Sequence, residues 1–282
     1  MFNLIYKNVL LSKFIHIHFL LQIIFIYLNG KINEIISVIK PKRKRVSALT
    51  KSSLSDYPTD LIAILIGGLL GDFNARIGKN NNTNNGKDLG VTFTIAQSDI
   101  HKDYIDWLHE IFYNYELCSN RIPKKETIKN TSKRARSEFS YKYVLYTSKR
   151  VAFKDIFFAF YKKDLITNRY KRGIYNIDFI QEWITPFSLA IWVMDDGTNL
   201  NGNIKFCTDS FSLNEVQILQ NILLTKFNIE TNLHNAGNGK PDQYRIYVTA
   251  KGMTKLIPLI EGYIIPSFKY KLGPKYTKKY NM

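Results

Sequence analysis

The sequence predicts an α+β fold built from two similar halves, each with the element order αββαββα. Two observations support this prediction. An apolar helical segment ends in an aspartate twice, first at Asp72 and again at Asp196. The same order of strand-like and helix-like segments then follows each aspartate. Such a repeat within one chain of 282 residues indicates an internal duplication.

The first half opens with the apolar segment DLIAILIGGLLGD, residues 60–72. A polar stretch and a Gly/Asn turn follow, and residues 91–98 (VTFTIAQS) form the second predicted strand. In residues 102–115 the apolar side chains recur at helical spacing, which predicts a helix. The remaining segments of this half are strands at 73–80, 120–128 and 139–148 and a closing helix at 151–163.

The second half opens with TPFSLAIWVMDDG, residues 185–197. A strand at 203–210 precedes a helix at 212–227, whose start is marked by a capping box of Ser212 and Glu215. The half then continues with strands at 228–235 and 243–250 and a helix at 252–263. We therefore divide the chain into an N-terminal extension with a basic linker (1–57), a first half (58–165), a linker (166–181) and a second half (182–282).

The N-terminal extension differs in composition from the rest of the chain. Residues 14–28 are apolar, but fifteen residues fall short of the ~20 that span a bilayer. A basic run, PKRKR at residues 41–45, then begins a Ser/Thr-rich stretch. The near absence of acids is typical of transit peptides. We expect an unfolded or targeting extension, with a membrane anchor as the alternative.

Charge and cysteine content limit the function classes. The formal net charge is +17, of which the first 53 residues carry +8 and the rest of the chain about +9. Such an excess indicates a polyanionic partner, either nucleic acid or an anionic membrane face. The two cysteines cannot build a disulfide framework, and no Cys/His cluster has zinc spacing. We expect both to be small buried residues in a reducing compartment.

The two aspartates occupy an unusual place, because a helix C-terminus carries partial negative charge and repels a carboxylate. They end two nine-residue segments, LIGGLLGDF (65–73) and LAIWVMDDG (189–197). With these segments the sequence resembles the LAGLIDADG homing endonucleases in their two-motif, single-chain, intron-encoded form. The resemblance covers about residues 58–275. It is strongest in the second half, in the segments TPFSLAIWVMDDG, CTDSFSLNEV, YRIYV and IIPSFKYKL.

The two motifs also depart from the family pattern. Phe73 stands where the first motif usually has glycine. The second motif has Ile191 and Asp195 where the first has Gly67 and Gly71. The two motif helices therefore differ in how closely another backbone can approach them.

The resemblance implies a fold, an activity and a metal site. The motif helices pack side by side at the interface of the halves, and two antiparallel sheets form a saddle over DNA. The implied activity is site-specific, Mg²⁺-dependent double-strand DNA cleavage that promotes intron homing. Asp72 and Asp196 are the implied catalytic and metal-binding residues. We prefer Asp196 to Asp195 because it shares register with Asp72, and we also assign Asp195 and Gly71 to the metal site.

The resemblance further implies basic groups beside the reacting phosphate. The segment FKYKL offers Lys271 for one of these groups. The segment RYKRGIY offers either Lys171 or Arg172 for the other, and the sequence does not decide between these two neighbours. Alternate residues of the strands would read base edges in the major groove, and basic loops would contact phosphates. The candidate DNA-binding residues are Asn74, Arg76, Lys79, Arg134, Arg136, Lys142, Lys205 and Arg245.

Two functions fit this resemblance. The leading hypothesis is an endonuclease acting as a pseudosymmetric monomer on a long double-stranded DNA site. The alternative is a maturase of the same fold, which assists splicing of its own group I intron RNA. Retention of both motif aspartates favours the nuclease, because RNA binding requires neither. The Lys-, Asn- and Ile-rich usage is typical of A+T-rich organellar genes, so we expect a mitochondrial or other organellar location.

Overall fold

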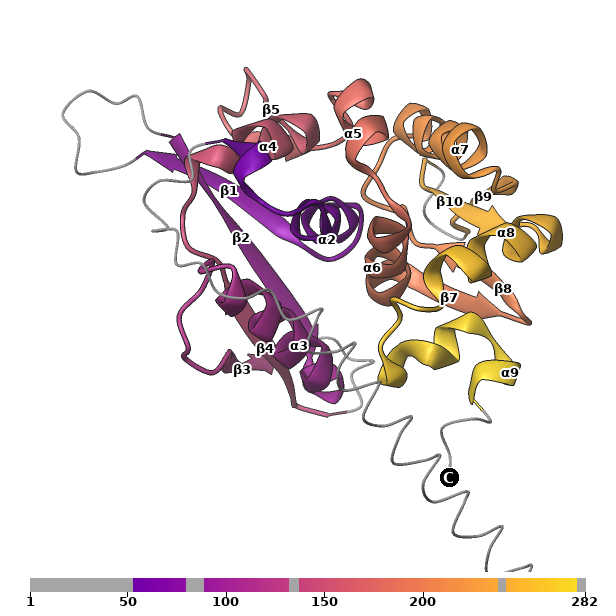
Figure 1. Cartoon of the computed structure of the whole chain (residues 1–282), viewed down its shortest axis with the longest axis horizontal. Helices are drawn as coiled ribbons and strands as arrows, with labels where there is room; N and C mark the ends of the chain where they lie inside the picture. Colours follow the sequence, from indigo (N-terminus) through magenta and orange to yellow (C-terminus); the bar gives the residue numbers. More distant parts are fainter. Residues whose placement is uncertain (1–52, 80–88, 132–136, 238–241, 278–282) are drawn as a thin grey trace, which may run out of the picture. The chain divides into compact units, whose positions relative to one another are not determined.

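The computed structural model of the protein describes residues 53–79, 89–131, 137–237 and 242–277 (Figure 1). The described residues all belong to one compact unit. The apolar stretch at 14–28 and the basic run at 41–45 lie outside the described residues. Among the helices that the structure describes, none is both long and apolar enough to cross a bilayer.

The first half has the predicted order of elements. Its helices and strands are α2 (Thr59–Leu70), β1 (Asn74–Lys79), β2 (Leu89–Ser98), α3 (Lys102–Asn114), β3 (Lys124–Lys129), β4 (Phe139–Tyr146) and α4 (Lys154–Phe160). The four strands form one antiparallel sheet in the order β1-β2-β4-β3. Along β2 the residues at positions 91, 93 and 95 are buried, as expected of a strand with one face on the core.

The second half repeats this order. Its elements are α6 (Pro186–Asp196), β7 (Gly197–Leu200), β8 (Asn203–Phe206), α7 (Leu213–Phe227), β9 (Thr231–Asn235), β10 (Tyr244–Val248), α8 (Ala250–Ile260), the 3₁₀ helix η4 (Pro266–Leu272) and α9 (Pro274–Thr277). The sheet order β7-β8-β10-β9 matches that of the first half, strand for strand. The predicted duplicated α+β fold is therefore confirmed. In the second half, the ranges of β7, η4 and α9 were missing from the prediction.

The segment that joins the halves contains more structure than the sequence indicated. The predicted closing helix at 151–163 ends earlier, because α4 stops at Phe160. A short antiparallel hairpin follows, made of β5 (Tyr161–Lys163) and β6 (Tyr170–Arg172). Helix α5 (Ile177–Trp183) then leads to α6. The hairpin and α5 occupy much of the segment that we assigned as a linker.

The last residues that we assigned to the N-terminal extension pack on the first half. A short 3₁₀ helix, η1 (Leu54–Asp56), precedes α2. Leu54 and Tyr57 are buried in the core, although we placed both in the extension. The ring of Tyr57 lies 4.8 Å from that of Phe153, which directly precedes α4. These last residues of the extension thus stabilise the first half.

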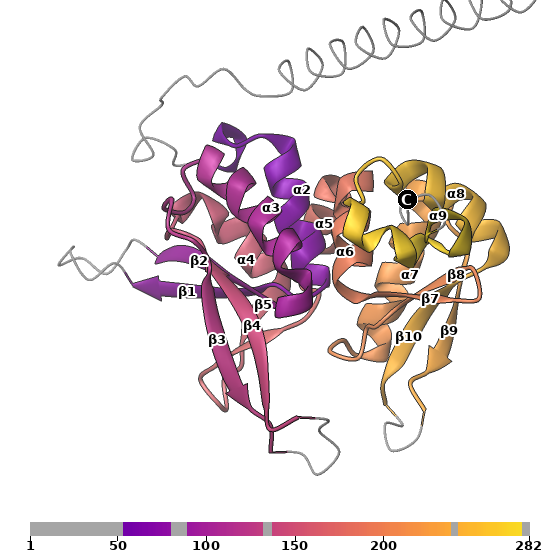
Figure 2. The same cartoon turned by 90° about the horizontal axis from the view of Figure 1, so that it is seen from below.

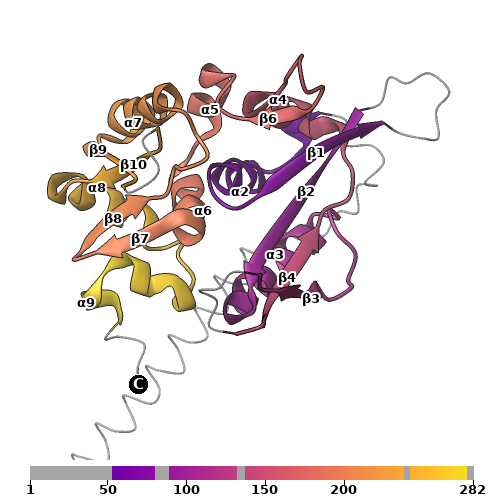
Figure 3. The same cartoon turned by 180° about the vertical axis from the view of Figure 1, so that it is seen from behind.

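Helices α2 and α6 pack side by side, with α2 in the first half and α6 in the second (Figures 2 and 3). Ten of the twelve residues of α2 are buried, so the helix is apolar on all sides, as a central core helix should be. A Cβ atom on Gly67 would lie 2.3 Å from the carbonyl oxygen of Ser188 in α6. The glycine therefore permits close backbone contact between the two motif helices.

The departure from the family pattern at Phe73 has a local cause. The Phe73 side chain is fully buried, and a Cβ on Gly68 would lie 2.3 Å from its ring. The ring therefore packs directly on the α2 backbone, so that an aromatic residue fills the space beside a glycine.

The start of α6 is also well defined. The hydroxyl of Thr185 accepts a hydrogen bond from the amide of Ser188, and Pro186 occupies the first helical position, where proline is favoured.

Candidate active site

The C-terminal ends of α2 and α6 bring three carboxylates together. The backbone amide of Asp72 donates a hydrogen bond to Oδ2 of Asp195, with an N···O distance of 3.3 Å. A Cβ atom on Gly71 would lie 2.4 Å from Cβ of Asp195. Gly71 therefore leaves the space that the Asp195 side chain occupies. Asp196 follows on α6 and interacts electrostatically with Asp72 across the interface.

A glutamine that sequence reasoning missed links two of these carboxylates. The side-chain amide of Gln97, at the end of β2, donates to Oδ2 of Asp72 at 2.6 Å and lies 3.5 Å from Oδ1 of Asp195. Only 9% of Gln97 is exposed. The residue continues the alternation that buries Phe93 and Ile95. A polar side chain on the buried face of an otherwise apolar strand was the sequence signal that could have identified it.

Each motif helix ends against a cation. The guanidinium of Arg172 donates from Nη2 to the carbonyl oxygens of Leu69 and Gly71 at the end of α2, the latter at 2.6 Å. The ammonium of Lys271 donates to the last carbonyls of α6, those of Val193, Met194 and Asp195. Cations at helix C-termini are favourable, so these two offset the repulsion that the helix ends exert on the aspartates.

The structure separates the two alternatives for the first cation. Arg172 reaches the end of α2, whereas Lys171 is exposed on the opposite face of β6. Lys171 is therefore placed away from the carboxylates. The carbonyl of Gly71, which we assigned to the metal site, already accepts the hydrogen bond from Arg172.

Each cation is also held by an aromatic ring. The guanidinium of Arg172 lies 5.4 Å from the ring centre of Phe211, which follows β8 in the second half. The ammonium of Lys271 lies 5.2 Å from the ring centre of Phe268. The Phe268 ring in turn contacts His101 and Tyr104 of the first half, at centroid distances of 4.6 and 5.2 Å. Arg172, which lies in the linker, thus depends on a ring of the second half, and the ring that holds Lys271 packs on the first half.

The carboxylates carry more negative charge than their surroundings balance. Burial, and then the charge of Asp72, raise the pKa of Asp196 to about 7, against the lowering effect of Arg172 and Lys271. Burial and Asp72 also raise the pKa of Asp195. The buried hydroxyl of Tyr104 lies beside Asp195 and acts in the opposite direction, lowering the pKa of Asp195. A cation bound here would relieve the repulsion among the carboxylates.

The residue types fit a hard divalent ion. Magnesium prefers oxygen ligands and keeps several waters, and the helix ends present three carboxylates. Within the described ranges, no group of three or more Asp, Glu, His or Cys side chains is arranged so that it could hold a metal ion by itself. An ion at this place would therefore complete its coordination with water or with phosphate oxygens of a substrate, as expected of a catalytic rather than a structural site.

The candidate DNA-binding residues fall into three groups. Asn74 and Arg76 are exposed on one face of β1. Lys142 and Arg245 are paired within the protein: Lys142 lies 3.5 Å from Glu126, and Arg245 donates twice to Asp209, both times at 2.7 Å. Lys205 is half-buried, and its ammonium lies 6.0 Å from the ring centre of Tyr247. The side chain of Lys79 lies outside the described part of the chain. Arg134 and Arg136 lie wholly outside the described residues.

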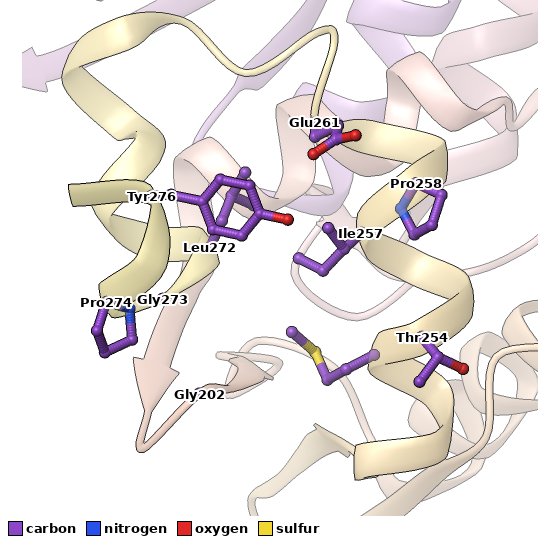
Figure 4. Close-up of a pocket in the computed structure, with 10 residues that line it drawn as sticks. Gly202, Thr254, Ile257, Pro258, Glu261, Leu272, Gly273, Pro274 and Tyr276 are labelled. Atoms are coloured by element: carbon purple, nitrogen blue, oxygen red, sulfur yellow. The ribbon is translucent and has the colours of Figure 1, made fainter. Parts of the chain in front are cut away.

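A pocket of about 650 Å³ lies elsewhere, between α8 and the C-terminal segment η4–α9 (Figure 4). Its lining is mostly apolar, with Met253, Ile257 and Tyr276 among the contributing side chains and Glu261 as the one acid. None of the carboxylates or cations at the helix ends lines it. The pocket is therefore separate from the candidate active site.

The paired helix ends agree with the comparison to known families. The LAGLIDADG DNA endonuclease family matches residues 62–256, which include both motifs. The chain belongs to this family. Its LAGLIDADG motifs are the segments that end α2 and α6, so the resemblance inferred from the two nine-residue segments is confirmed.

Individual family members are similar over most of the chain. The cytochrome b mRNA maturase bI2 of Debaryomyces hansenii is 32% identical over 214 residues, which is 76% of this chain and 74% of that protein. The intron-encoded endonuclease ai4 of Dictyostelium discoideum is 33% identical over 169 residues, 60% of this chain and 99% of that protein. The structure of the homing endonuclease I-WcaI bound to its DNA recognition sequence has a TM-score of 0.61 at 26% identity, covering 83% of this chain and 96% of that one.

Proposed function

We propose that this LAGLIDADG protein is a site-specific, Mg²⁺-dependent double-strand DNA endonuclease that promotes intron homing. The observation that carries the proposal is the convergence of Asp72, Asp195 and Asp196 at the ends of two paired helices, each capped by a cation. Arg172 and Lys271 add positive charge beside these carboxylates. A centre for phosphodiester hydrolysis uses such charge, because negative charge develops on the reacting phosphate.

The residues have distinct roles in this proposal. Asp72 and Asp196 would hold the ion, which when bound supplies positive charge and activates water for attack on phosphorus. Gln97 fixes the Asp72 carboxylate through its 2.6 Å hydrogen bond, and its amide nitrogen also lies 3.5 Å from Oδ1 of Asp195. Lys271 and Arg172 bind the helix-end carbonyls and set the positive potential around the reacting phosphate.

The partner and location follow from the same proposal. A long duplex would bind along both sheets, with Asn74 and Arg76 of β1 facing it. Both halves lie in one chain, so the protein would act as a monomer. A mitochondrial or other organellar location is supported by the A+T-rich residue usage and by the similarity to a cytochrome b mRNA maturase. We also propose the division of the chain into an extension (1–57), a first half (58–165), a linker (166–181) and a second half (182–282).

A maturase is the second candidate function. It is favoured by the 32% identity to the maturase bI2 of Debaryomyces hansenii. Such a protein would bind group I intron RNA and assist its folding, with or without DNA cleavage. One protein could have both activities, because RNA binding would not use the three carboxylates at the helix ends.

The deciding experiment compares cleavage and splicing by the full-length protein. We expect the wild type to cut the intronless version of its host gene when Mg²⁺ is present. We expect Asp196→Asn to bind that DNA with unchanged affinity and to cut it at least 10³-fold more slowly, because a metal ligand is lost. Asp178→Asn, at an exposed position on α5, is the matched control and should cut normally. Splicing stimulation without cleavage by the wild type would instead establish the maturase.

A further inference from the structure

The β5–β6 hairpin ends in two exposed aliphatic side chains. Leu165 is 94% exposed and Ile166 is 96% exposed, more than any other large hydrophobic residue in the described part of the chain. Single exposed hydrophobic residues are common and need no explanation. Two neighbours at the tip of one turn form an apolar knob, and a knob of this kind indicates a contact that the isolated protein does not make.

The turn that carries this knob is fixed by its own hydrogen bonds. Oδ1 of Asp164 accepts hydrogen bonds from the amides of Ile166 and Thr167, at 2.9 and 2.7 Å, and from the Thr167 hydroxyl at 3.0 Å. The amide of Asp164 donates to the carbonyl of Arg169 at 2.8 Å and closes the loop. The knob is therefore held in place before any partner binds, which lowers the entropic cost of binding.

The strands below the knob are basic. Lys162 lies directly opposite Lys171 in the hairpin, and like charges in such a cross-strand pair are destabilising. Lys163 and Arg169 are exposed nearby. In the described structure none of these four cations has a carboxylate within 4 Å. Asp164 is the one acid of the hairpin, and its carboxylate interacts electrostatically with Lys171. The four cations therefore leave an excess of positive charge around the turn, which indicates a polyanionic partner.

The base of the hairpin is attached to the candidate active site. Arg172, the last residue of β6, contacts the carbonyl of Gly71. The hydroxyl of Tyr161 in β5 accepts a hydrogen bond from the amide of Ala75, at the start of β1, at 3.1 Å. At a strand rise of ~3.3 Å per residue, the tip lies roughly 10–13 Å from Arg172. Figure 2 shows β5 on the side of the molecule toward which β3 and β4 extend.

We propose that this hairpin binds the target DNA beside the cleavage site. The cations contact phosphates, and Leu165 and Ile166 enter the minor groove as an apolar wedge that unstacks a base step. At ~3.4 Å per base pair, the tip reaches DNA about three to four base pairs from the scissile phosphate. The inference rests on the proposed endonuclease function and adds a second DNA contact, distinct from the sheets.

The wedge is tested with full-length protein and a target duplex carrying 2-aminopurine three or four base pairs from the cut, in buffer without divalent ions. Wild-type protein should raise the fluorescence of the unstacked base severalfold. The double variant Leu165→Ser/Ile166→Ser should abolish that rise and weaken binding about tenfold, since two aliphatic side chains lose their contact. Ile122→Ser, at a 79% exposed position before β3, is the control and should behave as wild type.

The outcomes separate this inference from the proposed function. Equal fluorescence and affinity for the double variant and the wild type would overturn the wedge while leaving cleavage intact. A double variant that binds DNA normally but loses affinity for the intron RNA would also overturn it, because the surface would then recognise RNA. Failure of the wild type to cut would instead count against the endonuclease. Both changed side chains are solvent-exposed, so the melting temperature should not move.

The phosphate contacts have a separate readout. In Lys162→Gln/Lys171→Gln, the slope of log Kd against log salt concentration should fall by about 1.8, because each neutralised phosphate contributes ~0.9. Lys255→Gln, at an exposed position on α8, should leave the slope unchanged. An unchanged slope in the double variant would show that the hairpin does not contact phosphate, and would overturn the proposal.

Discussion

Asp196 differs from an ordinary surface aspartate because its pKa is raised to about 7. Burial is the main cause, and the neighbouring charge of Asp72 adds to it. Arg172 and Lys271 act in the opposite direction but do not compensate fully. Near neutral pH the carboxyl group is therefore partly protonated in the metal-free protein, and a proton competes with any divalent cation for the same oxygens.

This competition predicts pH-dependent Mg²⁺ binding. Above pH 7 Asp196 is ionised and ready to bind, whereas below pH 7 an ion must displace its proton. The apparent affinity for Mg²⁺ should therefore fall by up to tenfold per pH unit below 7 and level off above it. Titration calorimetry at pH 6 and pH 8 measures the affinity and the released proton.

The control for this titration is Asp196→Asn, which has no proton to release at this position. It should bind Mg²⁺ weakly and lose most of the pH dependence. Equal Mg²⁺ affinity of the wild type at pH 6 and pH 8 would show that Asp196 is not a ligand.

The helix pair α2–α6 is the element on which the site depends. A Cβ on Gly67 would lie 2.3 Å from the backbone oxygen of Ser188, and a backbone atom cannot move aside as a side chain can. Gly67→Ala should therefore destabilise the protein by about 1–3 kcal/mol through overpacking, despite the ~1 kcal/mol gain in helix propensity. Thermal or denaturant unfolding of the full-length chain measures this loss.

Gly262→Ala provides the matched control. A Cβ at this position meets no atom within 4 Å, and the residue does not have a positive φ. Its free energy of unfolding should stay within about 0.5 kcal/mol of wild type or rise slightly. Unchanged stability in Gly67→Ala would mean that α2 and α6 do not pack as closely as described.

The sequence predicted those parts of the fold that depend on local pattern. The two motif segments and the capping box at Ser212 specify helices by spacing and end chemistry alone, and their duplication revealed the topology. The β5–β6 hairpin was missed because its strands are three residues each, too short for alternation to show. The apolar run of α4 also continues to Tyr161, the first residue of β5, so that the end of the helix is not marked in the sequence.

The active site was only partly predictable for a related reason. Asp72 and Asp196 are marked by the motifs, whereas Gln97 acquires its place only when β2 passes beneath the helix ends. The choice between Lys171 and Arg172 depends on strand register, since adjacent residues of β6 point to opposite faces. The pairing of Arg245 with Asp209 is likewise a tertiary contact that spacing along the chain does not reveal.

At the scale of the whole molecule, each cation site depends on a contact between separate parts of the chain. Arg172 is held against Phe211 of the second half. Lys271 is held against Phe268, whose ring packs on His101 and Tyr104 of the first half. In the proposed endonuclease, the duplication of the halves would place one cation near each strand of the bound duplex. Damage to one aromatic contact should therefore affect one strand more than the other.

This reasoning predicts strand-selective nicking by two matched variants. Phe211→Leu should slow cleavage of the strand that depends on Arg172. Phe268→Leu should slow cleavage of the strand that depends on Lys271. Each rate should fall by roughly 3- to 30-fold, because a cation–π contact contributes ~0.5–2 kcal/mol. On a supercoiled plasmid with one target site, both variants should accumulate nicked circles that the wild type passes through quickly. End-labelled duplexes then identify the uncut strand, which should differ between the two variants. If both variants slow the two strands equally, the rings contribute only to core stability, and each cation serves the site as a whole rather than one strand.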